Sequence, residues 1–359
     1  MRLIGRIGLA LVLLLGLVVA AGLAWRAHRQ AETARALAIT SARGVDEGFY
    51  VRLGGIDQWV QIRGQDRANP VILVLNGGPG FSMMAFTPLF QPWEKAFTVV
   101  QWDERGEGKT LGRNGAAGSG AMSIDRMTAD GLELTQFLRQ HLHKDKIIVL
   151  GHSWGTVLGL RMVKLRPDLF SAYVGTGQLV DKKENEQANY ARLMRTVRAA
   201  GDVAAIRQLE AIGPPLYKNI DTVSVQLRWE NKYATAAERN LTRTMAPYVL
   251  FAPNYSLKDI YDFEAGTQFS LRRTYDELNA YDARALGPDF AVPFFIIQGD
   301  QDTQTPTALA RQYFETVQAP AKAFVELKGG GHVAMLTLSD AFLQVLESRV
   351  RPLAVAAGS

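Results

Sequence analysis

The segment KIIVLGHSWG, from Lys146 to Gly155, constrains the fold of this chain more than any other feature. The run from Ile147 to Leu150 predicts a buried strand, and the following VLGLRMVKLRP has the periodicity of a helix. Ser153 stands between them, with one glycine two residues before it and another two residues after it. Small residues at these positions let strand and helix approach closely while the serine takes a strained conformation that exposes its hydroxyl. The pattern is typical of a nucleophile elbow, and the alternative is a chance G-x-S-x-G on a loop.

An elbow of this kind works with an acid and a histidine that follow the serine in the chain. The apolar run PFFIIQ (293–298) leads into GDQDTQTP, a carboxylate-bearing turn at the end of a predicted strand. We expect Asp302 to be the acid, because it stands three residues after a glycine and four before the proline that opens the next predicted helix. Asp300 competes with it, and its expected role is in the turn or as a cap.

The chain has five histidines, and His332 is the expected base. It follows three glycines and the strand-like KAFVEL (322–327), so a loop can bring its imidazole over Ser153. In the expected chemistry His332 takes the proton of Ser153 as the serine attacks an acyl carbon, Asp302 orients the imidazole, and water later hydrolyses the acyl-enzyme. The other histidines follow the N-terminal apolar segment, end a predicted helix or lie inside the elbow: His28, His141, His143 and His152.

A third predicted strand supplies candidates for stabilising the oxyanion of that reaction. PVILVL (70–75) runs into NGGPG (76–80), where glycines let the backbone approach a ligand closely. We expect the oxyanion hole to be formed by the backbone N–H groups of Gly78 and of Trp154, the residue after the nucleophile. The alternative is a turn that binds nothing.

Together NGGPG, WDERGEGKT (102–110), GHSWG, GDQDTQTP and GGGH resemble the motifs of the prolyl aminopeptidases, or proline iminopeptidases, a branch of the α/β-hydrolases. The resemblance covers residues 49–351, with the motifs in the family's order. The family usually has HGGPG and DQRGxGxS, so Asn76 and Glu104 depart from its pattern. The resemblance implies an α/β-hydrolase fold, with a mostly parallel central sheet, helices on both faces and a helical cap inserted between strands.

Alternation of predicted strands and helices around these motifs also favours a mostly parallel sheet, and the runs 48–53 and 58–63 predict an antiparallel start. Between Gly177 and Gly287 strand signals give way to helical periodicity with many aromatic residues. We therefore expect a hydrolase core at 46–178 and 288–352 and a helical cap at 179–287. Most cap aromatics should form the cap's own core, and a few should face Ser153.

The resemblance also implies an exopeptidase whose cap holds the α-amino group of the substrate. In such enzymes a glutamate ends a WxxWE pattern, and here Trp229 and Glu230 preserve the second half while Gln226 replaces the first tryptophan. Glu230, with Trp229 beside it, is therefore a candidate substrate-binding residue. The alternative is a solvated helix glutamate paired with Arg228 or Lys232. The family's second acidic contact, in an ENHYF-like segment, has no clear counterpart, which weakens a specificity for proline.

The first thirty residues predict a membrane segment. Arg2 and Arg6 precede an uncharged stretch, Ile7 to Trp25, whose length as a helix would be about 28 Å, close to the hydrocarbon thickness of a bilayer. We expect residues 1–30 to be an uncleaved anchor followed by a linker at 31–45, with cleavage and secretion as the alternative. The basic start predicts a catalytic domain outside the cytoplasm, in the periplasm, although arginines after the stretch weaken the charge asymmetry.

Composition excludes several other classes of function. The chain has no cysteine, hence no thiol nucleophile, disulfide or zinc–thiolate site, and its charge balance of 40 − 35 = +5 does not favour nucleic-acid binding. The histidines at 141 and 143 point to different sides of a helix, so we expect no metal and no cofactor. The segment 102–110 ends like a P-loop, but that motif needs glycine where Asp103 stands, and its carboxylates would repel phosphate. The sequence makes no prediction of oligomeric state.

Three hypotheses follow. The leading one is a serine aminopeptidase that takes N-terminal proline or another small residue from short peptides, with Glu230 holding the free amine. The second is an esterase or amidase on small acyl substrates that uses the same triad. The third is a non-catalytic, membrane-tethered binding module, which the complete set of Ser153, Asp302 and His332 disfavours. Epoxide and haloalkane hydrolysis are disfavoured because those relatives carry a carboxylate in place of the serine.

Overall fold

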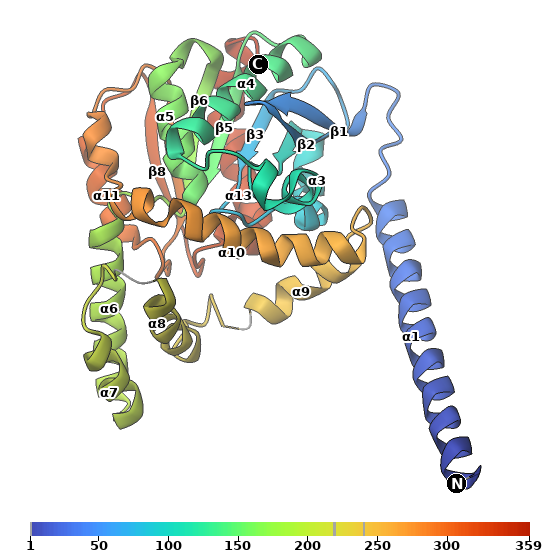
Figure 1. The fold of residues 1–359 in the computed structure, drawn as a ribbon. Coiled ribbons are helices and arrows are strands. Elements are labelled where there is room, and N and C mark those ends of the chain that lie inside the picture. Colours follow the sequence, from blue (N-terminus) through green and yellow to red (C-terminus); the bar gives the residue numbers. More distant parts are fainter. Residues whose placement is uncertain (1, 218–219, 240) are drawn as a thin grey trace.

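The computed structural model describes residues 2–217, 220–239 and 241–359. Its centre is an eight-stranded sheet with the order β1-β2-β4-β3-β5-β6-β7-β8 (Figure 1). The strands are β1 (Val45–Leu53), β2 (Ile56–Gly64), β3 (Val71–Leu75), β4 (Thr98–Trp102), β5 (Ile147–His152), β6 (Phe170–Thr176), β7 (Phe294–Gly299) and β8 (Lys322–Leu327). β1 pairs antiparallel with β2 and β2 antiparallel with β4, while every later pairing is parallel. The predicted mostly parallel sheet with an antiparallel start is confirmed.

The inner strands are apolar along their whole length because helices cover both faces of the sheet. Every residue of β3, β4, β5 and β6 is buried. Alternate residues serve opposite faces, as the period of a strand requires. Val71 and Leu73 belong to one core cluster, which includes α4 and α5, and Ile72 and Val74 belong to the other, which includes α13 and α14.

Fourteen α-helices occur among the described residues. Those of the core are α2 (Thr87–Phe90), α3 (Gly108–Gly118), α4 (Ile124–Leu142), α5 (Trp154–Leu165), α11 (Thr307–Thr316), α12 (Ala334–Thr337), α13 (Ser339–Val345) and α14 (Arg351–Ala356). Those between β6 and β7 are α6 (Lys182–Ala199), α7 (Val203–Ile212), α8 (Ile220–Lys232), α9 (Leu241–Phe251) and α10 (Leu257–Asn279). This second group occupies the segment predicted as a cap at 179–287, and it packs partly on its own cluster of buried residues from α6, α7 and α8.

The remaining helix, α1 (Arg2–Ala36), extends far from the body (Figure 1). The side chains from Ile7 to Trp25 are exposed, and an 18-residue window of this helix has a mean hydropathy of 2.8. The helix is long and apolar enough to cross a membrane or to act as a signal sequence. It continues through Ala36, so the segment predicted as a linker at 31–45 starts as helix and only 37–44 is an irregular connection.

Candidate active site

Ser153 lies at the sharp turn between β5 and α5, with φ 52° and ψ −114°. Positive φ is costly for a residue with a side chain, and such strain is concentrated at functional sites. A Cβ on Gly151 or on Gly155 would collide with backbone, in the second case with the carbonyl oxygen of Leu75. The two glycines are therefore required for the close packing of strand and helix that holds Ser153 in this conformation. The serine N–H donates to the carbonyl of Thr176 at 2.9 Å.

Asp302 and His332 meet at the carboxyl end of the sheet, next to the elbow. His332 Nδ1 lies 3.1 Å from both carboxylate oxygens of Asp302, and both side chains are buried. The carboxylate also accepts the N–H of Gln304 and the N–H and hydroxyl of Thr305, at 2.8–2.9 Å. The His332 ring packs beside Gly177. Gly177 directly follows Thr176, whose carbonyl accepts the N–H of Ser153. The structure thus brings the predicted acid and histidine into contact and places the histidine beside the strand end that binds the N–H of Ser153.

The pKa values of the pair follow from burial and from their contact. Burial raises the pKa of Asp302, but His332 and the Thr305 hydrogen bonds outweigh it and hold the pKa below its ordinary value. Burial lowers the pKa of His332, but the Asp302 carboxylate outweighs it and raises the pKa. The carboxylate therefore stabilises an imidazolium at His332, as a general base requires during proton transfer.

Asp300 and His152, the alternative residues for the acid and the base, make other contacts. Asp300 accepts the N–H of Gly329 at 2.8 Å and so belongs to the turn. His152 is buried in the elbow, where its Nε2 donates to the carbonyl of His332 at 3.1 Å. Burial and the neighbouring His332 lower the pKa of His152 to about 3. A neutral imidazole in this position holds the His332 loop against the elbow.

A cavity of about 200 Å³ lies over Ser153, between the core and the cap. Gly78 and Trp154, the predicted source of the oxyanion hole, both line it. Gly78 has φ 112°, and a Cβ there would lie 2.7 Å from the backbone nitrogen of Gly80. Only glycine permits this tight turn, which places Gly78 at the wall of the cavity.

Glu230 lines the same cavity from the cap side. Its Oε1 accepts a hydrogen bond from Gln226 at 2.8 Å, and Gln226 in turn accepts the hydroxyl proton of Tyr217 at 2.7 Å. Burial raises the pKa of Glu230 above its ordinary value. The alternative pairing with Lys232 is not formed, because Lys232 binds Asp202 at 2.6 Å. Gln226, the residue that replaces the family's first tryptophan, instead orients the glutamate.

Trp229 does not share this position. Its indole is buried in the core of the cap against α6 and α7, and its N–H donates to Gln208 at 3.2 Å. Successive residues of a helix point in different directions, so a helix that presents Glu230 to the cavity turns Trp229 away from it. The structure therefore places Trp229 as a packing residue of the cap, not along the cavity where a substrate contact was predicted.

A polar wall opposite α8 was missed in the sequence. Lys182, Asn185, Glu186 and Asn189 of α6 all line the cavity, and Lys182 forms an ion pair with Glu186. Among the described residues, neither amide atom of Asn185 has a hydrogen-bond partner, although both are buried. Buried polar groups are normally satisfied, so the amide of Asn185 has both a donor and an acceptor available at the cavity wall. The i, i+3, i+4, i+7 spacing of these polar residues was the available signal.

Three carboxyl groups of the segment 102–110 are buried behind the cavity. Glu104 accepts the indole N–H of Trp154 at 3.0 Å and the backbone N–H of Asn76 at 3.1 Å. Burial raises the pKa of Glu104 to about 8 and that of Asp103 to about 6. The two departures from the family motifs, Asn76 and Glu104, thus contact each other beneath the proposed oxyanion hole. Among the described residues no group of histidines and carboxylates is arranged to hold a metal ion.

Comparison with known proteins agrees with this geometry. Residues 70–337 match the alpha/beta hydrolase fold family, and the chain belongs to that family. Over 303 residues, 83% of this chain and 94% of the relative, it is 28% identical to a probable aminopeptidase, YbaC, of Bacillus subtilis. The crystal structure of a proline iminopeptidase from Mycobacterium smegmatis superposes with a TM-score of 0.63 at 19% identity, covering 87% of this chain and 100% of that one. An esterase from Thermogutta terrifontis has a TM-score of 0.55 at 16% identity, covering 86% and 99%. The resemblance to the prolyl aminopeptidase branch is confirmed.

Proposed function

We propose that this protein is a serine hydrolase that removes N-terminal proline or another small residue from short peptides through an acyl-enzyme. The observation that carries the proposal is that Glu230 and Ser153 line one cavity. A carboxylate at that place can hold the free amine of a substrate whose first carbonyl lies over the serine. The cavity volume of about 200 Å³ suits a small residue, since it is below the range of drug-sized sites.

The reaction follows from the hydrogen bond between Asp302 and His332. With Nδ1–H donated to the carboxylate, the lone pair of Nε2 accepts the hydroxyl proton as Ser153 attacks the carbonyl carbon. The N–H groups of Gly78 and Trp154 stabilise the oxyanion, and His332 returns the proton to the leaving amine. Water then attacks the ester with His332 again as base, which releases the free amino acid and restores the serine.

The raised pKa of Glu230 shows that burial disfavours its charged form, so a positively charged group bound beside it would stabilise the carboxylate. The carboxylate is half-buried and accepts a hydrogen bond from the neutral amide of Gln226, while Arg192 and Lys182 attract it only at longer range, so a positive charge directly beside it is favoured. A substrate ammonium supplies that charge, and charge-assisted hydrogen bonds of this kind contribute about 1.5–3 kcal/mol. The nearby Lys182 is engaged by Glu186 and leaves Glu230 available.

Aminoacyl naphthylamides with free and with blocked amines test this proposal directly. Glu230→Gln should reduce kcat/KM about 10- to 100-fold for free-amine substrates and leave blocked substrates nearly unchanged, because only the former lose a charged partner. The matched control is Glu210→Gln at an exposed position of α7. It should change kcat/KM for neither the free-amine nor the blocked substrates. Equal turnover of free and blocked substrates by the unmodified enzyme would instead favour the second candidate, an esterase or amidase. The structural support for that candidate is the apolar wall that the cavity has at Leu216, Leu271 and Leu278.

We also propose that α1 anchors the protein, with the catalytic domain outside the cytoplasm. The support is the exposed apolar surface of α1 together with its basic start. Protease added to spheroplasts should digest the domain. A domain left uncut in intact spheroplasts, but cut after lysis, would reverse the orientation.

A further inference from the structure

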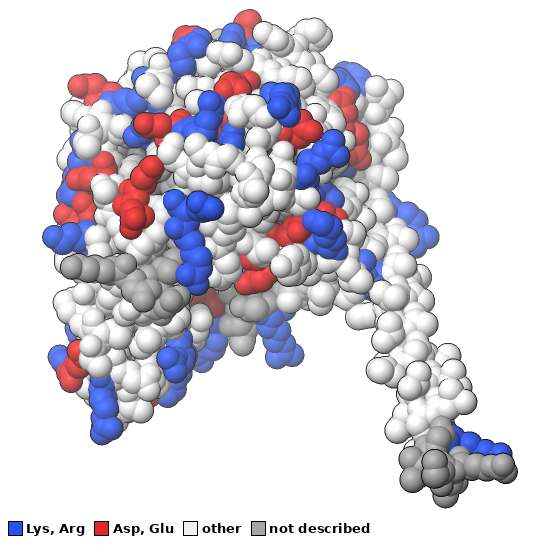
Figure 2. All heavy atoms as spheres, in the orientation of Figure 1, with Lys and Arg blue, Asp and Glu red and all other residues white. Residues whose placement is uncertain are grey.

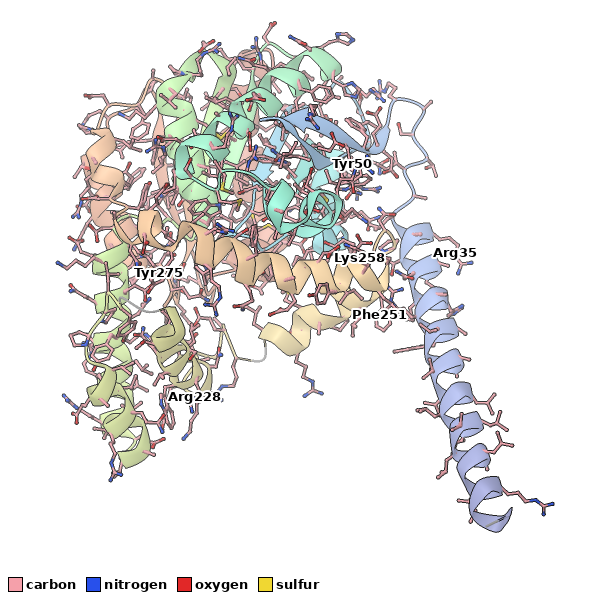
Figure 3. The ribbon with its side chains drawn as sticks, viewed as in Figure 1. Arg35, Tyr50, Arg228, Phe251, Lys258 and Tyr275 are labelled. Carbon is pink, nitrogen blue, oxygen red and sulfur yellow. The ribbon has the colours of Figure 1, made fainter. Side chains whose placement is uncertain are left out.

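The end of α1 is held against the cap. Trp25, the last residue of the uncharged stretch, packs edge-on against Phe251 at the end of α9, with 4.8 Å between ring centroids. Arg26 donates to the carbonyl of Leu250 at 3.0 Å and to that of Tyr255 at 2.6 Å. Figure 3 shows Phe251 beside α1. The end of α9 therefore lies at the level where the apolar part of α1 ends.

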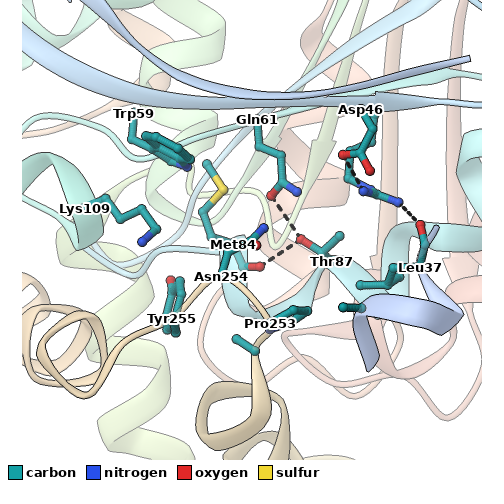
Figure 4. A pocket seen from close by; sticks show the side chains of 13 residues that line it. Leu37, Asp46, Trp59, Gln61, Met84, Thr87, Lys109, Pro253, Asn254 and Tyr255 are labelled. Atoms are coloured by element: carbon teal, nitrogen blue, oxygen red, sulfur yellow. Dashed lines mark hydrogen bonds and ion pairs between the residues drawn. The ribbon is translucent and has the colours of Figure 1, made fainter. Parts of the chain in front are cut away.

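The connection after α1 is also fixed to the core. The carbonyl of Leu37 accepts a hydrogen bond from Arg63, which is held in turn by Asp46 at 2.6 Å and Glu94 at 2.7 Å. Leu37, Asp46 and Arg63 border a small cavity between α1, β2 and the loop after α9 (Figure 4). Contacts of the last turns of α1 and of Leu37, which follows the helix, together set the direction of α1 relative to the body. In Figure 1 α1 leaves the body on the side toward which α6, α7 and α8 project, so a bilayer crossed by α1 lies on the cap side.

An apolar groove of about 450 Å³ runs along α9, the helix whose end is held against α1. Its walls come from α9, from α10 and from the core loops, and include Phe81, Phe86, Met245, Val249, Phe263 and Leu336. Leu250 at its edge is 45% exposed, and it is the residue whose carbonyl binds Arg26. The inner end reaches Val333, the neighbour of His332. An exposed apolar groove of this size marks a binding surface.

Helix α9 is loosely packed on both sides. A second cavity, of about 470 Å³, lies between α9 and α1 beside the contact of Trp25 with Phe251, and its lining includes Pro247 and Tyr248. The helix LTRTMAPYVLF has one charged residue in eleven, Arg243, which is exposed. An apolar helix with cavities along two faces, fixed to the end of a membrane helix, is suited to lie in the interfacial layer of a bilayer.

The cap offers exposed basic residues to such a surface. Its overall charge is nearly balanced, with 15 Lys and Arg against 14 Asp and Glu at residues 179–287. Arg228, Arg239 and Arg243 are exposed, and Figure 2 shows basic side chains on the lower part of the cap with acidic ones among them. Basic residues near a membrane surface are attracted to anionic headgroups by about 1 kcal/mol each.

We propose that this groove binds an acyl chain of a phospholipid from the bilayer that α1 crosses, with the basic residues of the cap on the headgroups. The proposal rests on the anchoring role of α1 and is independent of the chemistry at Ser153. It gives the cap two surfaces, a polar one toward the serine and an apolar one toward the membrane.

Photolabelling of the full chain tests this. The protein is placed in vesicles of phosphatidylcholine and phosphatidylglycerol that contain a phospholipid with a diazirine in its acyl chain, and labelled peptides are mapped by mass spectrometry. We expect labels on α9 and on the 81–86 loop in addition to α1. Ala246→Trp fills the groove and should remove the groove labels while the α1 labels persist, whereas Ala204→Trp on exposed α7 should keep both.

Every other labelling result contradicts either the groove proposal alone or the groove and anchor proposals together. Labels on α1 alone, or groove labels that survive Ala246→Trp in a protein with an unchanged Tm, overturn the groove proposal. An absence of label from α1 overturns the anchor and the groove together. If Ala246→Trp does not fold, Leu250→Arg at the exposed lip provides the same test and should reduce groove labelling. Hydrolysis of a soluble naphthylamide, measured in the same samples, reports separately on the proposed function.

Discussion

The core and the cap hold their side chains in different ways. In the core, β3 and β5 are buried along their whole length, and Ser153 sits in a conformation that neighbouring backbone enforces. In the cap, Asn185 is buried without a partner among the described residues, and α9 has a cavity on each side. Bond-making chemistry needs fixed geometry, whereas recognition of a ligand needs groups that remain available. The difference supports the proposal that the core carries out the reaction and that the cap selects the substrate.

The largest effect should come from the serine itself. Ser153→Ala should reduce kcat by about 10⁵-fold or more for peptide and ester substrates alike, because no acyl-enzyme can form. Steady-state rates and the pre-steady-state burst measure this. Ser348→Ala, at an exposed position near the C-terminus, is the control and should retain full activity. Substantial turnover by Ser153→Ala would break the assignment of chemistry to the elbow.

The two aspartates of one turn give the next comparison. Asp302→Asn should reduce kcat by about 10⁴-fold, because an amide no longer selects the productive tautomer of His332. Asp300→Asn alters the same turn but touches only the N–H of Gly329, and it should keep at least most of the activity. Comparable losses in the two variants would show that turn geometry, rather than the carboxylate beside His332, governs the rate.

The dependence on pH should reflect the same pair. The base is the neutral imidazole, so activity is present above the pKa of His332 and is lost as the pH falls through it. Because Asp302 raises that pKa above the ordinary value of 6.5, kcat/KM for a blocked ester should decline about tenfold per pH unit from above 6.5 downward. In Asp302→Asn the residual activity should decline at lower pH, since burial and Lys182 lower the pKa of His332 and Glu238 then opposes them without the Asp302 carboxylate. An unshifted profile would exclude His332 as the titrating group.

The smallest effect is expected at Trp229, whose role in the cap core differs from the role proposed for its neighbour Glu230. Trp229→Phe removes the hydrogen bond to Gln208 within the cap core and should lower the free energy of unfolding by about 1 kcal/mol. The preference for free over blocked amines should not change. Combining it with Gln208→Ala in a double-mutant cycle isolates this hydrogen bond. A changed amine preference would mean that the tryptophan contacts the substrate after all.

Much of the core was predictable because its signals are local. The apolar strand, the glycines around Ser153 and the glycines after β3 each specify backbone that only a few sequences allow, and the order of the motifs then indicates the partners. Choosing between Asp300 and Asp302 also used local spacing, but their different contacts depend on a loop thirty residues further along. The helical cap was predictable as a segment, whereas the facing of its helices was not.

The sequence by itself determined the class of fold, the elbow and the apolar N-terminal helix, since strand and helix periods, glycine positions and uninterrupted hydrophobicity are properties of neighbouring residues. Only the tertiary structure decided that Glu230 lines the cavity over Ser153 while Trp229 packs in the cap core, that α6 supplies a polar wall of this cavity, and that the end of α1 is held against α9. These outcomes depend on how helices distant in the chain rotate and pack against one another, and the period of a single helix does not specify its partner.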